Sequence, residues 1–161
     1  STPLNDDVSR TWVARSRAAL ADGSEADGEL ARAIASLTLE YLREEIDGVI
    51  VGREIPDVEA YLEEKRAGRR VRLTQQQRRG VWRVYEEREI AMRGRPERTF
   101  AQRRRRACEL IRAGKGPARY DGVVIDEAQD LPPTALRMLV GLCTSTDRLM
   151  LTADPNQSVY Q

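Results

Sequence analysis

The sequence predicts a mostly helical chain that ends in a small α/β part. Over most of residues 8–112 the apolar residues recur at helical spacing. Residues 121–161 instead contain two short apolar runs, at 123–125 and 149–152, with one helical stretch between them. Each run leads into acidic and amide side chains, as is typical of parallel strands whose carboxyl ends form a binding edge. We therefore expect a helical region followed by two parallel strands joined by a helix.

The composition is that of an ordinary soluble domain, with 40% hydrophobic and 33% charged residues. No segment approaches the roughly 20 apolar residues that cross a bilayer, and no secretory leader opens the sequence, so we expect a cytoplasmic protein without a membrane partner. The absence of histidine excludes a His-based catalytic triad. Cys108 and Cys143 are not at ligand spacing, which excludes a zinc site, and both are expected to be reduced thiols.

The net charge of +1 hides a strong polarity along the chain. Residues 1–64 carry a net charge of −9, residues 65–120 a net charge of +14, and residues 121–161 a net charge of −4. A cationic middle between two acidic segments indicates a surface that binds a polyanion.

Glycine and proline divide the first part of the helical region. A helix is expected over residues 8–20, followed by a loop that Gly23 and Gly28 interrupt. A second helix is expected from Leu30 to just before Gly48, because the apolar residues between them have a period of about 3.6. Residues 49–51 are too short a run to assign, and a third helix is expected through residues 58–62, between Pro56 and residue 68.

Two capping boxes predict the starts of longer helices. Thr74 with Gln77, and Thr99 with Gln102, each pair a threonine that accepts from the third helical amide with a glutamine that reaches back. The first helix is expected to run to about residue 92, and the second carries apolar residues to 111. The first helix should bury Val81, Trp82, Val84 and Tyr85, and the second should bury Ala107, Leu110 and Ile111. A strand at 123–125, a helix from 132 or 133 to 142 and a strand at 149–152 complete the prediction.

The residues with chemical potential lie at the ends of the two predicted strands. Hydrolysis of a nucleoside triphosphate needs a divalent cation across the β and γ phosphates and a group that activates water. Asp126 and Glu127 are placed for these two tasks. Two adjacent carboxylates alone most often begin a solvated loop. Gln129 and Asp130, followed by Asp154 and Gln157 after the second strand, favour a nucleotide site instead.

One part of such a site is missing from the sequence. No Gly-x-x-x-x-Gly-Lys-Ser/Thr loop occurs, and the nearest string, at residues 113–117, lacks the hydroxyl that would bind Mg²⁺. The chain also begins at Ser1 and ends at Gln161. We therefore expect it to be a piece of a larger protein, and we expect the piece by itself to be inactive.

Two segments resemble known motifs. Asp126-Glu127-Ala128-Gln129-Asp130 resembles motif II, and Asp154-Pro155-Asn156-Gln157-Ser158-Val159-Tyr160 resembles motif III, of the UvrD/PcrA/Rep-type superfamily 1 DNA helicases. Glutamine in the fourth position of motif II separates this group from the DEAD and DEAH families. The family usually has glycine directly before the motif III aspartate, whereas Thr152 and Ala153 precede it here. Residues 41–46 and 78–82 resemble, more weakly, the helical 1B insertion of these enzymes.

The resemblance implies a division of the chain and a role for each residue of the site. Residues 1–116 would form a helical, 1B-like region that contacts DNA, and residues 117–161 would form half of a RecA-like 1A ATPase core. Asp126 would hold Mg²⁺, Glu127 would activate water, and Gln157 would contact the γ phosphate of ATP and report it to the DNA site. Gln129, Asp130 and Asp154 would complete the nucleotide site. Tyr160 would stack on a base of single-stranded DNA.

The cationic middle of the chain is expected to contact DNA phosphates, because guanidinium groups bind phosphate without regard to base sequence. Two clusters are candidates for this contact. They contain Lys65, Arg66, Arg69, Arg70 and Arg72, and the run Arg103, Arg104, Arg105 and Arg106, of which Arg103 and Arg104 are assigned to DNA. The alternative is a solvated helix face on which glutamates balance the arginines. Trp12, Trp82 and Phe100 are expected in the core rather than on DNA bases.

We interpret the chain as part of an ATP-dependent DNA helicase that couples ATP hydrolysis to translocation on single-stranded DNA and to duplex unwinding. Its cofactors would be ATP and Mg²⁺, bound tightly only in the full-length protein, and its partners single-stranded and duplex DNA. Two alternatives stay open at this point. The chain could belong to a nuclease–helicase fusion, or it could be a non-catalytic helicase-like module that binds DNA or a protein partner.

Overall fold

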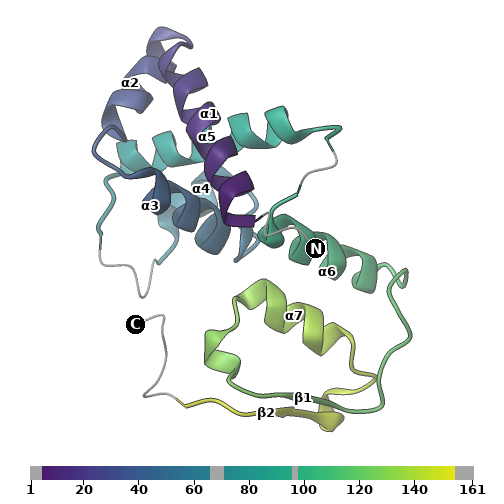
Figure 1. Ribbon diagram of the computed structural model, residues 1–161. Helices are drawn as coiled ribbons and strands as arrows, with labels where there is room; N and C mark the ends of the chain where they lie inside the picture. The colour runs from purple at the N-terminus through teal and green to yellow at the C-terminus, as the bar shows by residue number, and fades with distance from the viewer. Residues whose placement is uncertain (1–4, 66–70, 96–97, 155–161) are drawn as a thin grey trace.

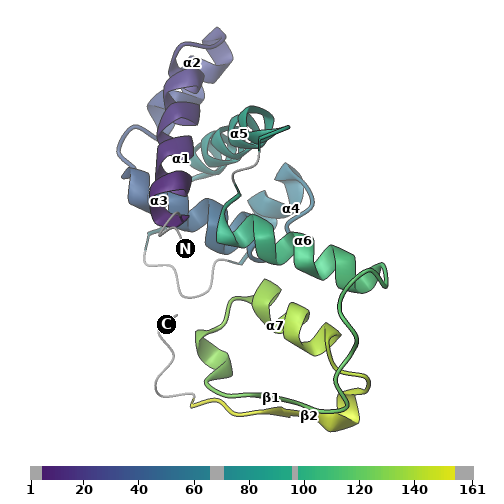
Figure 2. The ribbon, with the colours of Figure 1, turned by 45° about the vertical axis from the view of Figure 1, so that its right-hand side comes forward.

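The computed structural model describes residues 5–65, 71–95 and 98–154, which form a larger helical region and a smaller α/β part (Figure 1). The helical region contains α1 (Asn5–Ala21), α2 (Glu25–Ala33), α3 (Leu39–Glu44), η1 (Glu45–Val51), α4 (Val58–Glu63) and α5 (Gln75–Met92). The next helix, α6 (Phe100–Arg112), lies between the helical region and the α/β part (Figure 2). The α/β part contains β1 (Val123–Ile125), η2 (Ala128–Asp130), α7 (Pro133–Gly141), η3 (Thr146–Arg148) and β2 (Leu149–Leu151).

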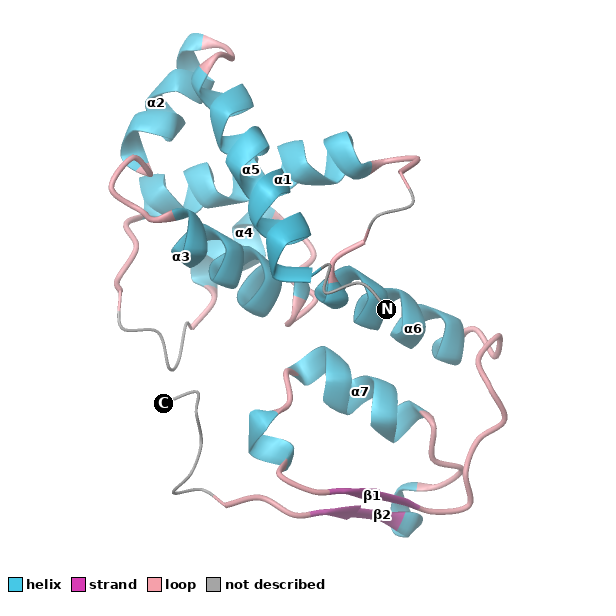
Figure 3. Ribbon diagram, viewed as in Figure 1, coloured by secondary structure: helices cyan, strands magenta, loops and turns pink. Residues whose placement is uncertain are grey.

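The two strands are parallel, and α7 joins them, so the predicted fold class is confirmed. Val123 lies opposite Leu149, and the register continues to Ile125 opposite Leu151. A further parallel bridge joins Tyr120 to Cys143 just before the strands begin. Because both strands run in the same direction, their carboxyl ends lie at the same edge of the sheet (Figure 3).

Both predicted capping boxes are present. The Thr74 hydroxyl accepts from the backbone N–H of Gln77 at 3.2 Å, and the Gln77 side chain accepts from the backbone N–H of Thr74 at 3.0 Å. Thr99 and Gln102 make the same two bonds at the start of α6. These bonds satisfy amide groups that a helix leaves unpaired in its first turn, which is why the helices begin at these residues.

The loop predicted after residue 20 is wrong, because residues 25–33 form α2. The cap of α2 is Ser24, whose hydroxyl accepts from the backbone N–H of Asp27 at 3.2 Å. The helix predicted from Leu30 to Gly48 is also wrong in its extent. It is interrupted after Ala33, and Thr38 caps a new helix, α3, by accepting from the backbone N–H of Tyr41.

The helical backbone also continues past Gly48, where the sequence predicted an end. Residues 45–51 form η1, a π-helix, in which Ile46, Val49, Ile50 and Val51 are all buried. The wider π-helical turn directs these four apolar side chains toward the core within six residues. Their burial outweighs the tendency of Gly48 to end a helix. Gly52 follows the segment, and glycine is required there because a Cβ would clash with the carbonyl oxygen of Gly48.

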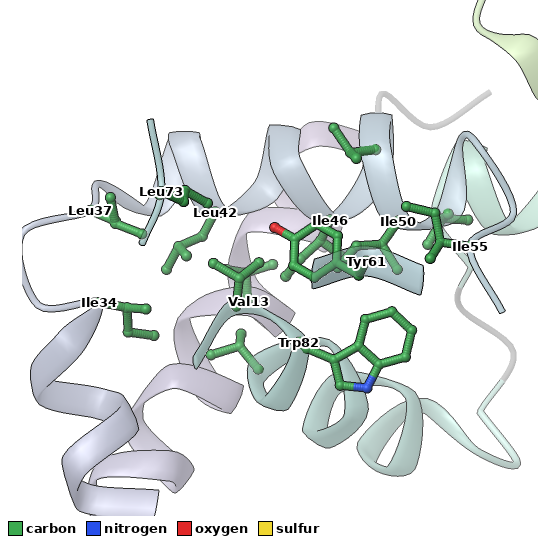
Figure 4. Packing of buried hydrophobic residues seen from close by; sticks show 14 of the residues in the cluster. Val13, Ile34, Leu37, Leu42, Ile46, Ile50, Ile55, Tyr61, Leu73 and Trp82 are labelled. Carbon is green, nitrogen blue, oxygen red and sulfur yellow. The ribbon is translucent and has the colours of Figure 1, made fainter. Parts of the chain in front are cut away.

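The core of the helical region is formed by apolar side chains from α1 to α5 and from the segments between them (Figure 4). The aromatic rings of Tyr61 and Trp82 lie 5.9 Å apart between centroids, and Tyr85 packs against Trp82 edge to face. α5 approaches α2 closely at Gly80, where a Cβ would come within 2.7 Å of Ile34 Cγ2. The fully buried members of the core are Val13, Leu20, Ile34, Leu42, Ile46, Ile50, Val51, Tyr61, Val81 and Val84.

The predictions for the large aromatic residues are partly confirmed. Trp12 and Trp82 are buried, as expected, but Phe100 is 56% exposed. The buried face of α6 contains Ala101 and Cys108, seven residues apart, and this phase leaves Phe100 on the other side. The sequence prediction was wrong here because the phase of a helix is set by its neighbour, and α6 packs against α7.

A buried ion pair connects three elements of the helical region. Arg88 on α5 is fully buried, and its guanidinium donates to the Asp47 carboxylate at 2.7 Å. The other carboxylate oxygen of Asp47 accepts from the hydroxyl of Ser9 on α1 at 2.5 Å. The Arg88 guanidinium also lies over the ring of Tyr85. Asp47 in η1 is therefore held from α1 and from α5 at once.

A second ion cluster connects the helical region to α6 and α7. Glu54 lies at the end of the turn that follows η1. Its carboxylate accepts from Arg112, in the last turn of α6, at 3.0 Å, and also from Arg137 in α7. Glu54 has φ of 57°, in the left-handed region, and this conformation directs the chain at the junction. The thiol of Cys108 on α6 also donates to the carbonyl oxygen of Thr134 on α7 at 3.2 Å.

Both cysteines are free thiols, as the sequence predicted. Burial raises the pKa of the Cys108 thiol, and the nearby Glu54 carboxylate raises it further, so this thiol is protonated at neutral pH. None of the helices in the described residues is both long enough and apolar enough to span a membrane.

The Glu54 cluster predicts a pH-dependent stability. Partial burial would raise the pKa of Glu54, but the hydrogen bonds from Arg112 and Arg137 outweigh it and hold this pKa below its usual value of 4.5. A carboxyl group with a lowered pKa in the folded state stabilises the fold above about pH 4.5, and this contribution is lost as pH falls through the lowered pKa. Glu54→Gln should therefore lower the thermal unfolding midpoint at neutral pH, and the difference from wild type should shrink below that pH.

Glu63→Gln is the matched control, because Glu63 is exposed and has no hydrogen-bond partner among the described residues. It should leave the midpoint unchanged at every pH. Equal midpoints for Glu54→Gln and wild type at neutral pH would show that the cluster does not stabilise the junction.

Candidate nucleotide site

The candidate site lies where β1 and β2 end, and backbone pairing continues there beyond the strands. The N–H of Thr152 donates to the carbonyl oxygen of Ile125 at 2.9 Å, and the N–H of Ala128 donates to the carbonyl oxygen of Thr152 at 2.9 Å. These bonds fold the segment after β1 around Thr152. As a result, residues 126–129 and 152–154, which are far apart in the sequence, lie side by side.

Asp126 is the first residue after β1, and its side chain is exposed and oriented. One carboxylate oxygen, Oδ1, accepts from the backbone N–H of Glu127 at 3.0 Å and from the hydroxyl of Thr152. Among the described residues, no donor contacts the other oxygen, Oδ2. The two hydrogen bonds fix the plane of the carboxylate and leave one oxygen available to a ligand from solution.

Glu127 has a backbone conformation that is uncommon for a residue with a side chain. Its φ and ψ are 52° and 43°, in the left-handed region. Such residues persist where the surrounding structure holds them, and they are concentrated at functional sites. Here the turn at Glu127 ends the strand direction and starts η2, in which the N–H of Asp130 donates to the carbonyl oxygen of Glu127 at 3.0 Å. The Glu127 carboxylate remains exposed at the strand edge.

Gln129 connects the two segments of the site through its side-chain amide. Its Nε2 donates to the Glu127 carboxylate, and its Oε1 accepts from the backbone N–H of Asp154 at 3.1 Å. Asp154 is half-buried, whereas Asp130 is exposed on η2. The structure thus brings Asp126, Glu127, Gln129 and Asp154 together at one edge of the sheet.

Other predicted site residues lie outside the described part of the chain. These are Gln157 and Tyr160 in the predicted site, and Arg66, Arg69 and Arg70 in the first basic cluster.

Thr152 is a site residue that the sequence analysis did not assign. The departure that the sequence analysis noted, the lack of glycine directly before Asp154, falls on Ala153 and gave no signal for Thr152. A hydroxyl at the end of β2 faces the end of β1 only if the strands are parallel and in this register. The pairing of the strands was therefore needed to recognise its role.

The basic residues of α6 form one side of a groove. The groove has a volume of about 600 Å³ and is lined by Val51, Glu89, Arg98, Gln102, Arg103, Arg105, Arg106, Ala107, Glu109 and Leu110. Of the two arginines that the sequence analysis assigned to DNA, Arg103 lines the groove and Arg104 does not. Arg105 and Arg106 do, and each pairs with Glu109, at 3.5 Å and 2.9 Å.

The charge of this groove is stable at neutral pH. Burial would lower the pKa of Arg105, but its interactions with Tyr85, Glu109 and Glu89 outweigh burial and raise this pKa above its usual value. Arg72, in the first basic cluster, is exposed as expected. The groove beside α6 therefore stays cationic at neutral pH, and its own carboxylates, Glu89 and Glu109, compete with an anionic partner for the arginines.

A metal ion at the strand edge would need ligands beyond the side chains of the described residues. Within the described residues, no three His, Cys, Asp or Glu side chains gather closely enough to hold an ion by themselves. Mg²⁺ commonly binds through one or two carboxylates together with waters and substrate phosphates. The single open oxygen of Asp126 fits that kind of site, in which the nucleotide supplies the other ligands.

Comparison with known proteins is consistent with this geometry. A family model, the UvrD/REP helicase N-terminal domain, matches residues 26–161, which include most of the helical region and the whole candidate site. No curated protein and no solved structure matches the chain.

Proposed function

Because this chain belongs to the UvrD/REP helicase family, we propose that it is part of an ATP-dependent enzyme that moves along single-stranded DNA and unwinds duplex DNA. In this proposal residues 117–161 form half of a RecA-like ATPase core, and residues 1–116 form a region that contacts DNA. α6 packs against both η1 and α7, so the two parts share an interface. A larger protein would supply the phosphate-binding loop and the remaining motifs.

The observation that carries the proposal is the orientation of Asp126. Two hydrogen bonds to Oδ1 hold its carboxylate at the strand edge with Oδ2 open. In the proposed site Asp126 holds Mg²⁺, which would neutralise charge on the β and γ phosphates of ATP. The adjacent Glu127 takes a proton from the attacking water. Asp130, Asp154 and Gln129 shape the same edge, and Gln157 contacts the γ phosphate.

DNA would bind to the cationic side of the helical region. The groove beside α6 presents Arg98, Arg103, Arg105 and Arg106, which can contact phosphates of any sequence. In the proposed enzyme Arg66, Arg69, Arg70 and Arg72 extend this surface, and Tyr160 stacks on a base of the single strand. The shared interface of α6 and α7 connects the DNA surface to the nucleotide site.

The assignment of Glu127 is tested by Glu127→Gln in the full-length protein. The amide is isosteric but cannot take a proton from water, so DNA-stimulated ATP hydrolysis should fall by roughly 10²- to 10⁴-fold. ATP binding, measured by calorimetry, should be retained. Asp121→Asn is the control, because Asp121 is an exposed carboxylate that lies just before β1. Hydrolysis by Glu127→Gln at the wild-type rate would remove Glu127 from the role of base.

The isolated 161-residue chain should bind Mg-ATP weakly, with a Kd of roughly millimolar order. Backbone amides of a phosphate-binding loop supply most contacts to the phosphates, and the sequence contains no such loop. Titration calorimetry measures this affinity, and Asp126→Asn should weaken it further. Micromolar binding by the chain alone would contradict the proposed division of the nucleotide site.

The DNA surface is tested by the salt dependence of binding. If the arginines of the groove contact phosphates, a plot of log affinity against log salt should have a slope of about −0.9 for each phosphate that is neutralised. Replacing Arg103, Arg105 and Arg106 by Ala should weaken binding equally across DNA sequences and flatten the slope by up to about three units. Fluorescence anisotropy with forked DNA at several salt concentrations measures both effects.

Two further variants make this test specific. Replacing the exposed Arg10, Arg32 and Arg148 removes the same charge from elsewhere on the molecule and should leave the slope nearly unchanged. Replacing Arg69, Arg70 and Arg72 tests the first basic cluster. An unchanged slope in the Arg103, Arg105 and Arg106 variant would assign these residues to a solvated helix face.

A further inference from the structure

The side chain of Gln129 connects Glu127 to the backbone of Asp154. Its two polar atoms have different partners, the Glu127 carboxylate at Nε2 and the Asp154 N–H at Oε1. Rotating the amide by half a turn would place its oxygen against a carboxylate and its NH₂ against an N–H. Both contacts would then be repulsive, so only one orientation of the amide satisfies the site.

The Glu127 carboxylate depends on this contact. It is exposed, it has three rotatable side-chain bonds, and Gln129 is its only hydrogen-bond partner among the described residues. The left-handed backbone at Glu127 fixes where the side chain starts, but not where the carboxylate lies. A base that is displaced by about 1 Å from its water loses much of its effect.

From this geometry we propose that Gln129 is a positioning residue, which sets the place of the Glu127 carboxylate according to the position of residues 152–154. The step from position to catalysis rests on the proposed function, in which Glu127 is the base. When the Asp154 N–H lies against Oε1, the amide is held and Nε2 keeps the carboxylate at the strand edge. A shift of the segment after β2 releases the amide, and the carboxylate is then free to rotate toward or away from water.

Two substitutions distinguish the contribution of the accepting oxygen of Gln129 from that of its donating NH₂ group. Gln129→Glu keeps an oxygen that accepts from the Asp154 N–H but places a second carboxylate against Glu127. Gln129→Met has similar length and removes both hydrogen bonds. Gln76→Glu, on the exposed first turn of α5, is the matched control for the added charge.

The first measurement needs no enzymatic activity. In the 161-residue chain, hydrogen exchange of the Asp154 backbone amide, followed by NMR, should be slow in wild type and in Gln129→Glu and at least several-fold faster in Gln129→Met. Equal exchange in wild type and Gln129→Met would show that the contact between Gln129 and Asp154 does not exist in solution, and it would overturn the inference. If Gln129→Met does not fold, Gln129→Asn, whose side chain is too short to reach both partners, replaces it.

The second measurement uses the full-length protein with DNA. Both Gln129→Glu and Gln129→Met should lower kcat for ATP hydrolysis by roughly 10- to 100-fold, with little change in KM for ATP, because the base is displaced while nucleotide contacts remain. Wild-type kcat in both variants would overturn the inference. If both Gln129 variants keep the wild-type kcat while Glu127→Gln abolishes hydrolysis, the positioning role of Gln129 is overturned and the proposed function stands. If Glu127→Gln also hydrolyses ATP normally, the assignment of the base falls first.

Discussion

The helical region depends on the ion pair between Arg88 and Asp47. A fully buried guanidinium loses its hydration, and here Asp47 accepts from it at 2.7 Å, Glu89 lies 3.4 Å away and the ring of Tyr85 lies beneath it. Breaking a buried pair of this kind costs about 3–5 kcal/mol. Asp47 also accepts from Ser9, so the pair fixes the positions of α1, η1 and α5 relative to one another. The apolar core adds stability to this arrangement, and the ion pair adds a directional contact between its elements.

The candidate site depends on a different constraint, the parallel pairing of two short strands. Three residue pairs set the register, and the bonds of Thr152 continue it past the strands. This brings the hydroxyl of Thr152 and the backbone N–H of Asp154, which follow the second strand, to the side chains that follow the first. Asp126 is then oriented by Thr152, and Gln129 is held by Asp154. The geometry of the proposed metal ligand and base is thus determined by contacts between segments that are more than twenty residues apart.

The two regions are joined by α6 and by the cluster around Glu54. α6 contributes its buried face to α7, its basic residues to the groove, and Arg112 to Glu54. One helix therefore contacts the α/β part and carries the cationic surface. Arg112 at the end of α6 and Arg137 of α7 both pair with Glu54, so this cluster links the two helices at the junction.

The sequence by itself determined the features that depend on neighbouring residues. Each capping box, at Thr74 and at Thr99, joins residues only three positions apart. The apolar run followed by Asp126 and Glu127 is likewise recognised from consecutive residues. The cap at Ser24 was equally local, but Gly23 and Gly28 concealed it. Tertiary structure decided the rest. The π-helix of residues 45–51 forms because four apolar side chains find the core together, and Phe100 is exposed because α7 sets the phase of α6. Thr152 gains its bond to Asp126, and Gln129 its bond to Asp154, only when the strands pair, since a hydrogen bond over more than twenty residues has no periodicity in the sequence that could predict it.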